Sequence, residues 1–244
     1  MSNGTGASTI AIFGATSAIG KEIADVLALR GRNLLLFARN TVECGELAAD
    51  LEKRHNVSVT VKPLDVNSFD PEVLRRDLRS QAPLDGVILC VGYLGDNEKA
   101  FSDPAEATRI MDTNFTGCVR ALDAAASALD GGFVCALSSV AADRPRRKVH
   151  TYGIAKAALN DYLDNLRARL ASKGVRVITI KLGSVDTRMV AHRRRHPFVT
   201  SARDAAVSIV DAAERLDGVV YLPPKWKYIM AAMKLLPDFV YGRI

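Results

Sequence analysis

Short apolar runs alternate with helical patterns along the whole chain, and this alternation limits the fold more than any other feature. Most of the runs are apolar without interruption, which is typical of parallel strands buried on both faces. We expect strands at Thr9–Phe13, Asn33–Phe37, Ser58–Val61, Gly86–Cys90, Gly132–Leu137, Arg176–Lys181 and Val219–Leu222. Helical patterns lie between them, near Ile19–Arg30, Val42–Arg54, Pro71–Arg79, Ala105–Leu129, Thr151–Ser172 and Ala202–Arg215. Seven strands joined by crossover helices predict an α/β fold, a doubly wound parallel sheet with helices on both faces.

A single domain accounts for almost the whole chain. No linker, low-complexity run or internal repeat divides the 244 residues, and 48% of them are hydrophobic, enough for a sizeable core. We assign residues 1–222 to this domain and residues 223–244 to a basic amphipathic tail. Met1–Ser8 lacks the build of a signal peptide, and no apolar run approaches the ~20 residues that span a bilayer. The four scattered cysteines are expected to be reduced packing residues, so we expect a cytoplasmic protein.

A glycine turn follows the first expected strand. The segment Gly14-Ala-Thr-Ser-Ala-Ile-Gly20 lies between Thr9–Phe13 and a helical pattern. A strand, a tight turn and a helix start, in this order, form a cradle for a pyrophosphate, because small residues let the backbone approach and the helix N-terminus faces the anion. The pattern predicts a Rossmann fold that binds a dinucleotide at the carboxyl ends of its strands.

Three side chains in the second half of the chain form a candidate proton-transfer set. Tyr152 and Lys156 are four residues apart, which places them on one helix face, and Ser139 precedes Tyr152 by thirteen residues. A nearby ammonium favours ionisation of a phenol, whose unperturbed pKa is about 10. The Ser139 hydroxyl can hold a substrate oxygen against that phenol. The set suits the interconversion of a carbonyl and an alcohol.

At these residues the chain resembles the short-chain dehydrogenase/reductase family, over nearly its whole length. Leu64-Asp65-Val66 is similar to the segment that binds adenine, and Leu182-Gly-Ser-Val-Asp-Thr187 to the segment that grips the nicotinamide amide. Asn114 matches a helix asparagine that helps to hold the lysine and a relay water. The resemblance implies an NAD(P)-dependent oxidoreductase acting on a CH–OH group, with Asn114, Ser139, Tyr152 and Lys156 as its catalytic residues. It also implies cofactor binding by Gly14, Thr16, Ser17, Ile19, Gly20, Asp65, Gly92, Tyr152, Lys156, Gly183, Val185 and Thr187.

Several positions depart from the family pattern. Ala18 replaces the middle glycine of the turn, and Leu89-Cys90-Val91-Gly92 replaces the usual Asn-Asn-Ala-Gly, which removes hydrogen bonds that normally brace the central sheet. Phe13 replaces a threonine and Leu182 a proline. Gly92-Tyr-Leu-Gly-Asp96 and the tail also resemble a narrower group, the reductases of decaprenylphosphoryl 2-keto-ribose.

The end of the second expected strand bears on cofactor choice. Leu36-Phe-Ala-Arg39-Asn40 offers no carboxylate to a ribose 2′-hydroxyl. Arg39 can instead pair with a 2′-phosphate through its guanidinium fork and stack on adenine. The sequence therefore favours NADP(H) over NAD(H), and NADPH in a reducing cytosol favours reduction of a ketone to an alcohol.

Two basic clusters and the tail bear on the substrate. Arg144, Arg146, Arg147 and Lys148 precede Tyr152, and Arg188 with His192-Arg-Arg-Arg-His196 lies in the expected lid over the substrate. They suit an anionic or lipid-linked carbonyl substrate, or equally a solvated loop surface. The tail carries lysines among Trp, Met and Leu residues, so it packs on the lid, on another subunit or on a membrane surface, which would make the protein peripheral to the inner membrane.

Other functions fit the residues less well. A 3-ketoacyl-type or small-ketone reductase is one alternative, and a non-catalytic dinucleotide sensor is another, although such sensors commonly lose the Tyr or Lys that this chain keeps. The net charge of +6 comes with no nucleic-acid motif, so no nucleic-acid partner is expected. His192 and His196 are four residues apart but have no carboxylate or cysteine company, so no metal site is expected. By resemblance, we expect a homo-oligomer.

Overall fold

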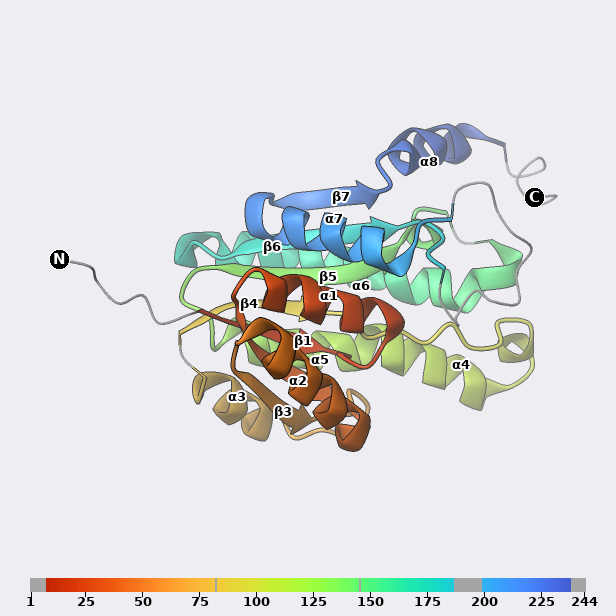
Figure 1. Ribbon diagram of the computed structural model, residues 1–244. Helices are drawn as coiled ribbons and strands as arrows, with labels where there is room; N and C mark the ends of the chain where they lie inside the picture. Colours follow the sequence, from red (N-terminus) through yellow and green to blue (C-terminus); the bar gives the residue numbers. More distant parts are fainter. Residues whose placement is uncertain (1–7, 82, 145, 187–198, 238–244) are drawn as a thin grey trace.

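Seven parallel strands form one sheet in the order β3-β2-β1-β4-β5-β6-β7 (Figure 1). The computed structural model describes residues 8–81, 83–144, 146–186 and 199–237. The expected α/β fold class is confirmed, and each predicted strand end lies within two residues of the observed one. The strands are β1 (Thr9–Phe13), β2 (Asn33–Ala38), β3 (Val59–Pro63), β4 (Leu84–Leu89), β5 (Phe133–Ser139), β6 (Arg176–Leu182) and β7 (Gly218–Leu222).

The strand order reverses between β1 and β4. The chain builds outward from β1 through β2 to β3, then returns to the other side of β1 and continues from β4 to β7. Phe13 at the end of β1 pairs with Phe37 on one side and Leu89 on the other, so the strands on both sides of the reversal end at the same level. Open parallel sheets bind ligands outside the carboxyl ends of their strands at such a reversal.

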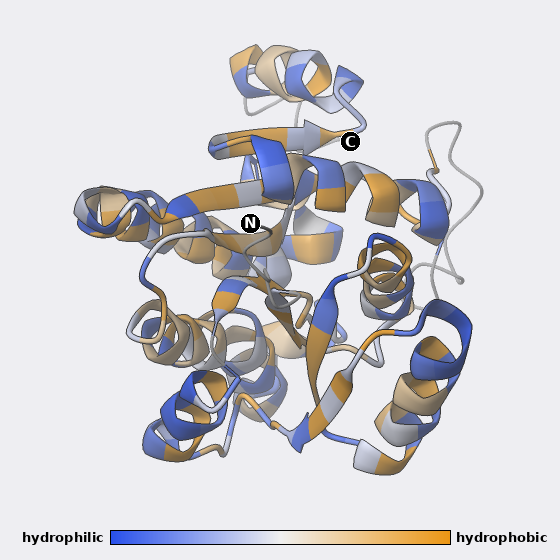
Figure 2. Ribbon diagram, turned by 60° about the vertical axis from the view of Figure 1, so that its left-hand side comes forward, coloured by the Kyte–Doolittle hydropathy of each residue, from blue (hydrophilic) through white to orange (hydrophobic). Residues whose placement is uncertain are grey.

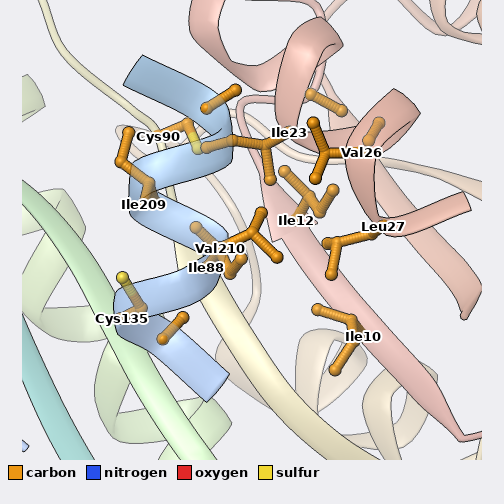
Figure 3. Packing of buried hydrophobic residues seen from close by; sticks show 14 of the residues in the cluster. Ile10, Ile12, Ile23, Val26, Leu27, Ile88, Cys90, Cys135, Ile209 and Val210 are labelled. Carbon is orange, nitrogen blue, oxygen red and sulfur yellow. The ribbon is translucent and has the colours of Figure 1, made fainter. Parts of the chain in front are cut away.

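Helices cover both faces of the sheet. On one face lie α1 (Ala18–Leu29), α2 (Thr41–His55) and α7 (Ala202–Arg215), and on the other lie α3 (Pro71–Arg79), α5 (Gly117–Ala126) and α6 (His150–Leu170) (Figure 1). In Figure 2 hydrophobic colouring predominates along the central strands, whereas the helices alternate between hydrophobic and hydrophilic stretches, as amphipathic helices do. Figure 3 shows part of the core on the face covered by α1, α2 and α7, where Ile23 and Val26 of α1 and Val210 of α7 turn toward Ile12 and Ile88 of the sheet.

The core on the face covered by α3, α5 and α6 contains a leucine stripe of α6. Four leucines of α6 are buried together against the face of the sheet: Leu159, Leu163, Leu166 and Leu170. The stripe is therefore part of the hydrophobic core.

The four cysteines are also buried and form no disulfide. Burial raises the pKa of the Cys44 and Cys118 thiols to about 11 and that of Cys90 to about 12, so the packing role expected for cysteine is confirmed.

The predicted helix near Ala105–Leu129 is not continuous. It consists of α4 (Pro104–Met111), a π-helical turn over Asp112–Thr116, and α5. A Cβ on Gly117 would lie 2.5 Å from the carbonyl oxygen of Val66, so the helix approaches the backbone after β3 more closely than any other residue type would allow. Periodicity does not register a single wide turn, and π turns concentrate at functional sites.

The tail forms a helix beyond the carboxyl end of β7. This helix, α8 (Lys225–Leu235), lies at the edge of the molecule in Figure 1. Only Met230 of α8 is buried, whereas Tyr228 and Leu235 are 75% and 85% exposed. Among the helices of the described residues, none combines the length and the hydropathy that a bilayer crossing requires.

A cluster of charges ties α1, α2 and α7 together at the surface. Asp25 of α1 pairs with Arg54 and His55 of α2, at 2.5 and 2.9 Å, and with Arg203 of α7. Burial acts to raise the pKa of Asp25, but hydrogen bonds from His55, Arg54 and Arg203 outweigh it and lower the pKa to about 2. The ionised carboxylate thus contributes to stability.

Replacing Asp25 with Asn should lower the stability of the fold by about 1–2 kcal/mol at pH 7, because three donors lose a charged acceptor. Since the folded-state pKa is depressed, this contribution is present above the ordinary carboxyl pKa of 3.8 and is lost as pH falls toward 2. Urea unfolding of both proteins between pH 7 and pH 2.5 measures the difference. A difference that grows on acidification would contradict this assignment.

Candidate active site

The glycine turn after β1 brings the start of α1 against the end of β4. Gly14 has a φ of +83°, and a Cβ there would lie 3.2 Å from backbone atoms of Cys90 and Val91. At Gly20 a Cβ would lie 2.4 Å from the carbonyl oxygen of Gly14. Both positions require glycine, because backbone occupies the space that a side chain would need. The predicted glycine turn thus lies at the point where the strand order reverses, and its binding of a pyrophosphate stays a prediction.

The N-terminus of α1 faces this cradle. Ser17 is its N-cap, and the Ser17 hydroxyl accepts a hydrogen bond from the Gly20 amide at 3.0 Å. Thr16 and Ile19 are half-buried on either side, and Ala18, which replaces the family glycine, is the first residue of α1. First-turn amides of a helix lack intrahelical partners and attract anions, so this end suits a phosphate.

Arg39 and Asp65 follow the strands on the outer side of the cradle. Arg39 directly follows β2 and is exposed. Asp65 follows β3, is half-buried, and its carboxylate accepts a hydrogen bond from the Asn67 amide at 3.0 Å. Glu43, the nearest acidic residue along the chain after β2, forms an ion pair with Lys21 of α1 at 2.7 Å. No local pattern predicts this ion pair, because its partners are 22 residues apart.

Ser139 and Tyr152 lie at the carboxyl edge of the sheet. Ser139 ends β5, and its half-buried hydroxyl accepts a hydrogen bond from the Ala141 amide at 3.1 Å. Tyr152 is half-buried in the first turn of α6, with its backbone N–H donating to the Oδ1 atom of Asn97 at 3.0 Å. Asn97 did not stand out in the sequence, because the two residues are 55 positions apart.

Lys156 lies one turn after Tyr152 and is only 2% exposed. Its ammonium donates to the carbonyl oxygens of Leu137 at 2.9 Å and Val91 at 3.4 Å. Burial lowers the pKa of Lys156 from its ordinary value. The two carbonyls belong to β5 and to the segment after β4. The ammonium is therefore fixed at the edge of the sheet where β5 ends with Ser139.

Asn114 holds the loop that follows β4. It lies in the π turn, is fully buried, and donates through Nδ2 to the carbonyl oxygens of Tyr93 at 2.6 Å and Ile110 at 2.8 Å. Its Oδ1 accepts from the Tyr93 amide at 3.1 Å. Both amide hydrogens are therefore used on backbone. A holding role follows from these contacts, whereas the relay role expected from the resemblance stays a prediction.

The segment after β6 is covered by the tail. The Gly183 amide donates to Leu222 at 2.9 Å, and a Cβ on Gly183 would lie 1.9 Å from the indole nitrogen of Trp226. Val185 is buried and forms a bridge with Thr200, while Thr187 lies outside the described residues. Gly92 is exposed just after β4. Trp226 was assigned to the tail but not to this contact, which only the fold brings about.

A buried carboxylate joins α8 to the loop after Ser139. Asp143 is 1% exposed at its side chain, and it accepts from Lys181 at 2.5 Å, Tyr221 at 2.7 Å and Lys234 at 3.2 Å. Burial acts to raise the pKa of Asp143, but hydrogen bonds from Lys181 and Tyr221 outweigh it and lower the pKa. The carboxylate therefore stays ionised and ties β6, β7 and α8 to this loop.

Arg144 caps the other end of the same contact. Its guanidinium donates to the carbonyl oxygens of Met233 and Leu236 at the end of α8, both at 2.6 Å. Arg144 therefore acts neither as an anion-binding residue nor as part of a solvated loop surface, the two roles predicted for the first basic cluster. It satisfies helix carbonyls that would otherwise lack partners. Arg146 is half-buried and Lys148 exposed, and the second basic cluster, residues 188–196, lies outside the described residues.

The doubly wound sheet and the glycine turn after β1 are features of dinucleotide-binding proteins. A family model described as short chain dehydrogenase matches residues 8–197. An uncharacterised oxidoreductase of Mycobacterium tuberculosis is 31% identical over 245 residues, which cover 98% of each chain. The chain belongs to the short-chain dehydrogenase family and is a dehydrogenase/reductase.

Solved structures share this fold. A short-chain dehydrogenase from Sphingobium yanoikuyae in complex with NADPH gives a TM-score of 0.81 at 23% identity, covering 95% of this chain and 97% of that one. The bulky-bulky ketone specific alcohol dehydrogenase from Comamonas testosteroni gives 0.80 at 23% identity, covering 95% of each chain. The narrower resemblance to decaprenylphosphoryl 2-keto-ribose reductases stays a prediction.

Two helical glycines allow a matched test of the cradle. Gly20→Ala should destabilise the protein by about 1–3 kcal/mol and weaken NADPH binding, because its Cβ meets the Gly14 carbonyl. Gly45→Ala is the control: nothing lies within 4 Å of that Cβ, and the change should stabilise α2 by up to about 1 kcal/mol. Urea unfolding and NADPH fluorescence titration measure both. Equal behaviour of the two variants would contradict the close approach at Gly20.

Proposed function

We propose that this chain reduces a ketone to an alcohol with NADPH as the hydride donor. The observation that carries the proposal is the buried Lys156 ammonium, fixed by carbonyl oxygens of Leu137 and Val91 at the strand edge where Ser139 and Tyr152 also lie. An ammonium one helical turn from a phenol makes that phenol a better proton donor near neutral pH.

A dinucleotide fits the residues present. Gly14 and Gly20 leave backbone surface bare at the start of α1, where a Cβ would fill the space, and the helix N-terminus attracts phosphate. When bound, the nicotinamide ring supplies the hydride. The Val185 and Gly183 segment after β6 would hold that ring, because it lies at the same edge as Ser139.

The chain's own residues manage the oxygen of the substrate. The Ser139 hydroxyl donates a hydrogen bond to the carbonyl oxygen and positions it. Tyr152 gives its proton to that oxygen as charge develops there, and it is reprotonated from solvent afterwards. The Lys156 ammonium stabilises the phenolate that remains. Asn114 keeps the loop after β4 in place through Tyr93, and we expect a relay water nearby.

Tyr152→Phe tests the proton donor. Turnover of NADPH with a panel of ketones should fall by roughly 10²–10⁴-fold, because the proton is no longer supplied. NADPH affinity should stay within about twofold, since the change removes a single hydroxyl group. Tyr162→Phe on the same helix is the matched control, because the Tyr162 hydroxyl bonds Asp123 instead. If Tyr152→Phe keeps the activity of the wild-type protein, as Tyr162→Phe should, this mechanism is wrong.

Arg39 supports NADP(H) over NAD(H). It is exposed at the end of β2, no acidic residue accompanies it in Ala38-Arg39-Asn40, and Glu43 is paired with Lys21. The Asn40 side chain accepts from the Glu43 amide at 3.3 Å, where it caps α2. The guanidinium is thus the group best placed to meet a 2′-phosphate, which it binds through a bidentate fork.

Arg39→Ala should weaken NADPH binding by roughly 10–100-fold, the loss expected for charge-assisted hydrogen bonds. NADH binding should change by less than about twofold, because NADH lacks the phosphate. Arg169→Ala, at a position whose side chain is 66% exposed, serves as the charge-matched control. Titration of both cofactors measures the effect, and equal losses for NADPH and NADH would contradict the assignment.

The exposed face of α8 supports a lipid-linked or anionic substrate taken from a membrane surface. Tyr228 and Leu235 project at 75% and 85% exposure beside the exposed Lys225 and Lys227. Amphipathic helices of this composition lie in the interface of anionic membranes, with lysines toward the headgroups. Trp226 and Arg144 join α8 to the active-site loops, so a surface held by α8 would lie beside the site.

The membrane contact is tested by a variant that leaves the buried side of α8 intact. Replacing Lys227, Tyr228 and Leu235 together with Ser should abolish co-sedimentation with phosphatidylglycerol vesicles, because the basic and apolar contacts are both lost. Turnover of a water-soluble ketone should stay within about twofold of wild type. Vesicles of phosphatidylcholine alone are the control. Unchanged sedimentation with the anionic vesicles would rule out this contact.

We also expect a homo-oligomer and a cytoplasmic location beside the inner membrane. Members of the family commonly assemble as oligomers. The edge strand β7 leaves Val219 44% exposed, and the nearby Leu216 is 46% exposed, so apolar surface is available for a second copy.

A further inference from the structure

The helix that carries Tyr152 has no cap of its own. Val149 occupies the N-cap position of α6, and no side chain there accepts a hydrogen bond from the first turn. Helix starts leave four amides without intrahelical partners, and a cap normally serves the second or third residue. Tyr152 is the third residue of α6. An active-site side chain thus sits on a helix turn that needs support from elsewhere.

Asn97 supplies that support from a different part of the chain. Its Oδ1 accepts from the Tyr152 amide at 3.0 Å, and its Nδ2 donates to the Leu94 carbonyl at 2.8 Å. Asn97 is 4% exposed, so water cannot readily take its place. It belongs to the loop of residues 92–98, here called the β4 loop.

The β4 loop is itself held on several sides. Asn114 bonds both the amide and the carbonyl of Tyr93. Glu106 of α4 accepts from the Tyr93 hydroxyl at 3.0 Å and from the Asp96 amide at 2.8 Å. Arg109 lies over the Tyr93 ring at 4.4 Å from its centroid. The loop therefore presents Asn97 in one position.

We infer that Asn97 is a positioning residue for the reaction, which fixes Tyr152 relative to Ser139 and Lys156 by capping the first turn of α6. The inference rests on the proposed function. A first turn without its cap frays, and the phenol would then spend less time aligned with the substrate oxygen. Asn97 touches neither substrate nor cofactor in this account, and it acts only through the backbone of Tyr152.

The test compares Asn97→Leu, which removes both hydrogen bonds, with Asn97→Asp, which keeps an acceptor for the Tyr152 amide. Asn97→Leu should lower kcat for ketone reduction by roughly 10–100-fold while the KM for NADPH stays within about twofold. The kcat of Asn97→Asp should lie within about fivefold of the wild-type value when each protein is measured at its own pH optimum. Asn97→Ala, which also removes both hydrogen bonds, takes the place of Asn97→Leu if the latter is not recovered folded.

Hydrogen exchange measures the cap without a substrate. Amides at the start of α6 should exchange about tenfold faster in Asn97→Leu than in wild type, and those of α7 should not change. Asn33→Leu is the matched control, because Asn33 also accepts from a backbone amide, that of Ser58 at 2.9 Å, at the opposite edge of the sheet. It should leave both kcat and exchange in α6 unchanged.

The outcomes separate this inference from the proposed function. Wild-type kcat in Asn97→Leu, with or without faster exchange, would overturn the positioning role. Parallel losses of kcat and NADPH binding would overturn it too, because they would indicate a general loss of folded protein. Absence of ketone reduction by the wild-type protein would instead remove the proposed function, and the inference with it.

Discussion

A buried ammonium fixes the helix that carries the candidate catalytic residues Tyr152 and Lys156. Lys156 is 2% exposed, and burial of a charge is costly unless hydrogen bonds compensate for it. The compensation comes from carbonyl oxygens of Leu137 and Val91, on two neighbouring segments of the sheet edge. Because these acceptors are backbone atoms, the ammonium fixes α6 against β5 and the end of β4. Tyr152, one turn away on the same helix, inherits that position.

The sheet topology brings the remaining parts of the site to this edge. The strand order reverses between β1 and β4, so the glycine turn after β1 lies against the backbone of Cys90 and Val91 at the end of β4. Parallel strands end on one side, which places the Arg39 and Asp65 loops on one flank and Gly183 on the other. Asp143 and Arg144 then fasten α8 to the loop after Ser139. A single edge thereby collects groups from the whole chain.

The sequence predicted what depends on local pattern. Continuous apolar runs mark buried strands, so the fold class followed from the sequence. Gly14, Gly20 and the spacing of Tyr152 and Lys156 are short-range signals too, so the glycine turn and the helix face of the candidate site could be predicted. The contacts of Asn97 with Tyr152 and of Asp143 with Lys234 join residues far apart in the chain. No periodicity encodes them. The one local clue was Val149, a residue that cannot cap the helix it precedes.

The most direct measurement is transfer of the label from NADPH carrying deuterium at C4, prepared separately on each face of the ring. The wild-type protein, incubated with a panel of ketones, should form an alcohol with one deuterium on the carbinol carbon from one of the two labelled cofactors, as mass spectrometry detects. Consumption of NADPH without label in any alcohol, or no consumption at all, would contradict hydride transfer to a carbonyl at this site.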